Sequence, residues 1–70
     1  MMYADKFPAR LREARERAGL SQTAFAQMID HEQPQVSRWE RGVGRMNVDL
    51  ILTTCEILHI SADWLIGRVD

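Results

Sequence analysis

Residues 20–42 read LSQTAFAQMIDHEQPQVSRWERG, and this stretch decides the fold. Ser21 is a good N-cap, and the apolar residues after it fit the period of one helical face. After a short polar turn, Pro34 suits the first turn of another helix, where its missing N–H costs nothing, and Gly42 suits the position just past its end. We therefore expect two short helices joined by a tight turn, over residues 22–29 and 33–41.

The rest of the chain also reads as helix. Apolar residues from Phe7 to Ala18 recur at spacings of four and three, and Gly19 follows them. Asn47 caps an apolar stripe formed by Val48, Ile51, Cys55 and Leu58, and Ser61 caps a last short segment that ends before Gly67. No segment alternates as a strand does. The pattern predicts an all-α fold with a single domain, 1–70, and helices over 5–18, 22–29, 33–41, 47–58 and 61–66.

Composition narrows the class of protein. Seventy residues with 46% hydrophobic and 27% charged residues are expected to form one compact globular core. The single cysteine, Cys55, cannot form an internal disulfide, and no His or Cys cluster has metal-ligand spacing, which suits a reducing cytoplasm. No apolar run is long enough to cross a bilayer. We expect a soluble, cytoplasmic protein without cofactor or metal, and the absence of any nucleophile–base pair argues against an enzyme.

The charge is unevenly distributed. The net charge is −1, but residues 1–45 carry eight Lys or Arg against six Asp or Glu, which gives +2. Residues 46–70 carry one against four, which gives −3. A polyanionic partner is therefore expected to meet the first half of the chain.

The residues of this first half match a known pattern. Leu20-Ser21-Gln22, Phe25-Ala26 and the run Val36-Ser37-Arg38-Trp39-Glu40-Arg41-Gly42 resemble the phage-repressor, or XRE-type, helix-turn-helix family, and the similarity continues through residues 58–65. The resemblance implies a five-helix, lambda-repressor-like bundle whose second paired helix enters the DNA major groove. It also implies a sequence-specific transcription regulator, most simply a repressor that binds a palindromic operator as a dimer.

The family pattern assigns roles to individual residues. Gln33, Gln35, Ser37 and Arg38 are expected to meet base edges, since Gln pairs well with adenine and Arg with guanine. Gln22, Arg41 and Arg45 are expected to contact phosphate. Arg15 and Glu40 match an internal ion pair of the family.

The chain departs from the family pattern at three turn or cap positions. Asp30 and His59 stand where relatives commonly have Gly, and both residue types enter the left-handed region more readily than most. Glu32 replaces the usual Ser or Thr cap, which puts a carboxylate close to the expected path of the phosphates. It either weakens DNA binding or accepts a hydrogen bond from cytosine.

Other residues carry a plain and a functional interpretation. Trp39 and Cys55 are expected in the core. His31 and His59 are expected to be ordinary turn residues. Arg10 and Arg17 are expected on a solvated helix face rather than in contact with phosphate. Leu50, Ile57, Trp64 and Ile66 either pack helix five or form a dimer contact, and we favour the dimer. The alternative function is an antitoxin-type module that binds a protein partner through its C-terminal half.

Overall fold

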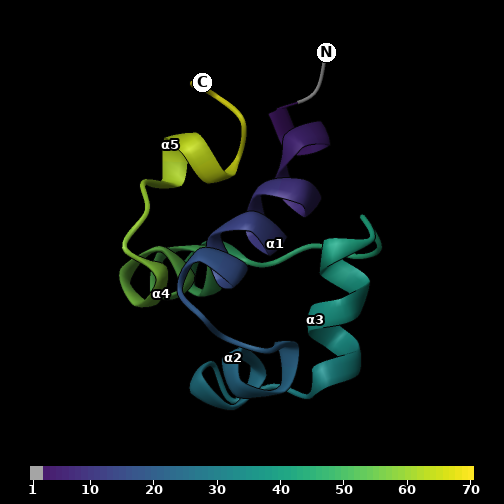
Figure 1. Cartoon of the computed structure of the whole chain (residues 1–70). Helices are drawn as coiled ribbons and strands as arrows, with labels where there is room; N and C mark the ends of the chain where they lie inside the picture. Colours follow the sequence, from purple (N-terminus) through teal and green to yellow (C-terminus); the bar gives the residue numbers. More distant parts are fainter. Residues whose placement is uncertain (1–2) are drawn as a thin grey trace.

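Five α-helices and one short 3-10 helix make up the computed structural model, which describes residues 3–70 (Figure 1). Within this range there is no strand, so the predicted all-α, five-helix fold is confirmed. The elements are η1 (Tyr3–Lys6), α1 (Phe7–Arg17), α2 (Gln22–Met28), α3 (Gln33–Glu40), α4 (Val48–Leu58) and α5 (Ala62–Leu65).

Side-chain caps fix where three helices begin. The Ser21 hydroxyl accepts the backbone N–H of Ala24 at 3.0 Å, and the Asn47 side chain accepts that of Leu50 at 2.8 Å. The Ser61 hydroxyl does the same for α5, at 3.0 Å. Each bond satisfies one of the N–H groups that a helix leaves without a partner in its first turn. The residues that the sequence suggested as caps therefore cap these helices.

The first helix begins later than predicted. The expected start was Asp5, but α1 begins at Phe7 and the preceding residues form the 3-10 turn η1. Pro8 explains the difference, because it has no N–H to donate to the carbonyl four residues earlier. It sits in the first turn of α1, where that loss costs nothing.

Two non-glycine residues take up left-handed backbone angles at turns. Asp30, between α2 and α3, has φ 63°, and His59, after α4, has φ 56°. The left-handed conformation costs Asp and His less free energy than it costs most residues, in line with the expectation from the sequence. The α2–α3 turn is closed by the His31 N–H, which donates to the Ala26 carbonyl at 2.8 Å. The turn geometry is thus kept without glycine.

Every α-helix contributes to one core. Val36 and Trp39 of α3 are buried as predicted, and the remaining core side chains are Leu11, Ala14, Phe25, Ala26, Ile29, Met46, Cys55, Leu58 and Leu65. The prediction was wrong for Val48, which is 71% exposed. Val48 lies in the first turn of α4, beside the loop from which Met46 fills the core instead. Thr54, one helical turn from Leu58, is fully buried next to Met46.

The arrangement puts the paired helices at one end of the molecule. In Figure 1, α2 lies at the bottom with α3 beside it, while α5 and the C-terminus lie at the top. None of the helices in residues 3–70 has the length and apolar character needed to span a bilayer. Helices α2 and α3 therefore lie away from α5 and the C-terminus.

Candidate nucleic-acid interface

Helix α3 is anchored on one side and open on the other. Val36 and Trp39 hold it against the core, and the Trp39 ring centroid lies 5.3 Å from that of His31 in the preceding turn. Arg38 and Arg41 point away from this anchored side and are exposed. The helix thus presents a polar surface that is not needed for folding.

A line of hydrogen bonds joins this helix to α1 and α2. Arg15 Nε donates to Glu40 Oε2 at 2.6 Å, and Arg15 Nη2 donates to Glu40 Oε1 at 3.0 Å. Glu40 Oε1 also accepts from Gln22 Nε2 at 3.1 Å, and Gln22 Oε1 in turn accepts from Gln33 Nε2 at 2.8 Å. Four side chains from three helices are therefore ordered as one network.

The Arg15–Glu40 pair at the base of this network is sheltered from water. The two side chains are 9% and 4% exposed. The hydrogen bond to Glu40 raises the pKa of Arg15, and Arg15 Nη1 also donates to the Leu20 carbonyl at 2.8 Å. Such a two-bond pairing fixes the position of both helices, because each bond restricts direction as well as distance.

At the other end of the network, Gln22 and Gln33 are held in place by each other. Gln22 is the first residue of α2 and Gln33 the first residue of α3. Sequence analysis placed both at the interface but missed the bond between them. Helical periodicity has no signal for a contact across a turn, so only the packing of α2 on α3 reveals it.

Three of the four cations that form no ion pair in residues 3–70 lie on and just after α3. Lys6, Arg12, Arg15, Arg17 and Arg68 each form an ion pair, and Arg10 donates to backbone carbonyls. Within residues 3–70 the three remaining cations form no ion pair, and they are Arg38, Arg41 and Arg45. Arg41 Nε donates only to the Ser37 carbonyl, at 3.3 Å. Three arginines without an ion pair therefore lie on or just after α3, where Glu32 is the nearest carboxylate in sequence without one.

Comparison with known proteins identifies this arrangement. The helix-turn-helix family model matches residues 11–65. The chain belongs to the phage-repressor-type helix-turn-helix family. It is 30% identical over 59 residues to the HTH-type transcriptional regulator ImmR of Bacillus subtilis (strain 168), a match that covers 84% of this chain and 46% of ImmR. The chain thus spans about half the length of this relative.

Two solved structures show the same fold. The P22 c2 repressor in complex with a synthetic operator has a TM-score of 0.78 and 27% identity, over 84% of this chain and 89% of that one. The restriction-modification controller protein C.AhdI from Aeromonas hydrophila has a TM-score of 0.77 and 37% identity, over 90% of this chain and 94% of that one. In this family the paired helices are α2 and α3.

Not every residue expected at the helix-turn-helix surface lies on its outward side. Gln33, Ser37 and Gln35 are each half-buried, but Gln35 lies on the flank toward the α3–α4 loop (residues 41–47). Its side-chain nitrogen is 3.9 Å from the position that a Cβ on Gly44 would take. Two residues along a helix turn the direction by about 200°, which separates Gln35 from Gln33.

An acidic residue stands at the start of α3. Glu32 is the N-cap of α3, yet its side chain makes no capping hydrogen bond, and it is exposed. Its carboxylate belongs to no ion pair in the described part of the chain. The side chain is therefore available to meet whatever approaches Gln33.

Arg10 faces the opposite end of the molecule from α3. Its Nη1 donates to the carbonyls of Trp64 at 2.5 Å and Val69 at 2.6 Å, and its guanidinium lies 5.0 Å from the centre of the Trp64 ring. Lys6 Nζ and Asp70 Oδ1 are 3.1 Å apart beside it, and Lys6 lowers the pKa of Asp70. Arg10 therefore ties residues 64–70 to α1. The sequence offers no signal for contacts between residues so far apart.

The four residues expected at a dimer contact are all half-buried. Leu50, Ile57 and Trp64 are half-buried and pack against the core, and Ile66 is also half-buried. The most exposed large apolar side chains of α4 are instead Val48, at 71%, and Leu52, at 49%. These two lie one helical turn apart and hence on the same face.

The remaining titratable and thiol groups form no second site in the described chain. Within residues 3–70, no group of three or more His, Cys, Asp or Glu side chains is placed to hold a metal ion. Cys55 is buried, and its burial raises the pKa of the thiol. The His31 Nδ1 lies 2.8 Å from the Ile29 carbonyl, within its own turn.

Proposed function

We propose that this chain is the DNA-binding unit of a transcription repressor, and that α3 enters the major groove of its operator. The observation that carries the proposal is the gathering of three unpaired cations, Arg38, Arg41 and Arg45, on α3 and the loop after it. The P22 c2 repressor, which shares the fold, was solved on a synthetic operator. DNA phosphates are anions that these arginines would contact.

We assign base reading to the residues that α3 holds outward. Gln33 can form two hydrogen bonds with an adenine, and its bond to Gln22 fixes its direction before DNA arrives. Arg38 can form two with a guanine, and Ser37 lies beside it on the same helix. Gln35, on the flank, is assigned a base contact at the edge of the site. Cytoplasmic localisation agrees with the reduced state of Cys55 that the core requires.

We assign phosphate contacts to Gln22, Arg41 and Arg45. Gln22 follows the N-cap of α2, where backbone N–H groups and the helix dipole favour an anion. Arg41 is the C-cap of α3 and Arg45 lies in the loop after it, and both are exposed. Such contacts fix the orientation of the protein on the duplex and give no sequence preference by themselves.

We propose that the operator is an inverted repeat bound by two copies of the chain. One recognition helix of eight residues contacts only a few base pairs, so a second copy supplies the rest of the specificity. The two α3 helices would then lie about 34 Å apart, one turn of DNA. We place the contact between the copies on the face of α4 that carries Val48 and Leu52, because burying these side chains removes exposed apolar surface from water.

Affinity as a function of salt tests the DNA-binding proposal. On a duplex selected from random sequence, log K is expected to fall linearly with log salt concentration, with a slope of about −0.9 for each phosphate neutralised. Arg41→Ala is expected to make that slope shallower by about one. Arg17→Ala, which removes an exposed arginine already paired with Glu13, is the matched control and should leave it unchanged. The proposal is contradicted if the chain does not bind DNA at low salt, or if its affinity for DNA does not change with salt concentration.

A further inference from the structure

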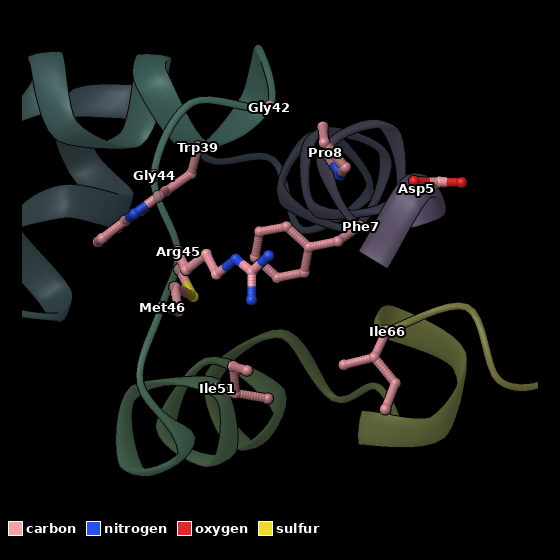
Figure 2. Close-up of a pocket in the computed structure, with 10 residues that line it drawn as sticks. All are labelled: Asp5, Phe7, Pro8, Trp39, Gly42, Gly44, Arg45, Met46, Ile51 and Ile66. Carbon is pink, nitrogen blue, oxygen red and sulfur yellow. The ribbon is translucent and has the colours of Figure 1, made fainter. Parts of the chain in front are cut away.

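A pocket with a volume of about 400 Å³ lies on the side of the molecule next to α3 (Figure 2). It opens between the start of α1, the α3–α4 loop, α4 and α5. Apolar side chains form much of its wall, and they are Phe7, Met46, Ile51 and Ile66. This volume falls within the range of small-molecule sites in proteins. None of the roles proposed above uses the space.

Two hydrogen-bond donors of the pocket lining have no partner. The Trp39 side chain lines the pocket, and its indole N–H is buried without a hydrogen bond in the described structure. That nitrogen is closed off from solvent, so it is not a contact point for a molecule in the pocket. Arg45 also lines the pocket and forms no ion pair with any described residue. Figure 2 shows its side chain reaching from the loop toward the middle of the space.

The charges around the pocket decide what would occupy it. Asp5 is the only carboxylate in the lining, and Figure 2 shows it on the outer rim, turned away from Arg45. Arg45 is a donor only, so it suits a ligand with acceptor oxygens. The apolar wall suits a hydrocarbon body attached to them.

We propose that this pocket binds a small organic carboxylate with an apolar body. The carboxylate accepts hydrogen bonds from the Arg45 guanidinium, and the apolar body lies against Phe7 and Ile66. The pairing of guanidinium and carboxylate fixes the orientation of the ligand, because the two planar groups can form two parallel hydrogen bonds.

If the proposed function holds, a carboxylate bound in this pocket would reduce DNA binding. Arg45 is assigned a phosphate contact, so a carboxylate that holds it competes with DNA for the same cation. The pocket also includes Trp39 of the recognition helix, and its Gly44 lies beside Gln35. Ligand and DNA are therefore expected to weaken each other by the same factor, as linkage requires.

The test is a titration of the isotope-labelled chain with sodium phenylacetate, without DNA, followed by proton–nitrogen correlation spectra. The chain has two tryptophans, so two indole N–H signals are expected, and Trp64→Phe assigns them. Phenylacetate should shift the Trp39 indole signal and the Gly44 amide signal with saturation. Arg45→Ala should weaken this binding about tenfold, the loss expected for one charged hydrogen-bond pair. Phenylacetamide, which lacks the charge, should bind as weakly to the parent as phenylacetate does to Arg45→Ala.

The control is Arg17→Ala, which removes an arginine remote from the pocket and should bind phenylacetate as the parent does. Three results overturn the proposal: no saturable shift of the Trp39 signal up to about 10 mM phenylacetate, equal binding by Arg45→Ala, or equal binding of phenylacetamide. Phenylacetate binding by a chain that binds no DNA supports the pocket and contradicts the proposed function. DNA binding by a chain that does not bind phenylacetate contradicts the pocket proposal and leaves the proposed function standing.

Discussion

The structure predicts that Glu40→Ala is strongly destabilising. Glu40 accepts three side-chain hydrogen bonds, two of them from Arg15, and its removal leaves the Arg15 guanidinium sheltered and without its anion. Breaking a buried ion pair in this way costs about 3–5 kcal/mol. A chain of 70 residues has a total stability of only about 4–10 kcal/mol. Glu40→Ala should therefore remove about a third of it or more.

The matched control is Glu13→Ala, which removes the same charge and the same side chain from an exposed ion pair. The Arg17 and Glu13 side chains are 75% and 48% exposed, so this change should cost less than about 1 kcal/mol. Urea denaturation followed by circular dichroism measures both variants. Because about 1 kcal/mol shifts Tm by about 4–8 °C in so small a domain, Glu40→Ala should melt at least about 12 °C lower. Free energies of unfolding of the two variants that agree within about 1 kcal/mol would refute the reasoning.

Three further predictions concern other parts of the molecule. Leu52→Lys should raise the dimer dissociation constant, measured by analytical ultracentrifugation, about tenfold or more. The control Val69→Lys changes another exposed apolar side chain and should leave the constant unchanged. Equal effects of the two variants contradict the α4 interface. Burial raises the pKa of the Cys55 thiol, so the stability that its protonated form contributes is complete below the unfolded-state pKa and is lost as pH rises through the folded-state pKa. Accordingly, iodoacetamide should label native Cys55 far more slowly than the urea-unfolded chain at pH 8, and equal rates disprove its burial. Glu32→Gln should tighten DNA binding at every site if Glu32 only repels phosphate, but should relax the preference at one base pair if it reads cytosine, and a binding-site selection separates the two.

The features that sequence reveals here are the local ones. Ser21, Asn47 and Ser61 act within a single helical turn, so residue type and spacing suffice to place them. The left-handed turns at Asp30 and His59 are likewise set by a few neighbouring residues.

The features that escaped prediction depend on how distant elements meet. The exposure of Val48 follows from where the first turn of α4 sits relative to Met46, which periodicity does not contain. The bond between Gln22 and Gln33 crosses the turn between two helices. The contacts of Arg10 join residues more than fifty positions apart, so they appear only once α5 is packed beside α1.

The central claim is that α3 reads bases through Gln33 and Arg38. Selection of random-sequence duplexes by the parent chain and by Arg38→Ala tests it most directly. The parent should enrich an inverted repeat, and Arg38→Ala should lose preference at one base pair of each half-site, at a cost of about 1–3 kcal/mol there. Enrichment of no sequence by the parent, or an Arg38→Ala profile that is weaker but unchanged in sequence, would contradict the claim.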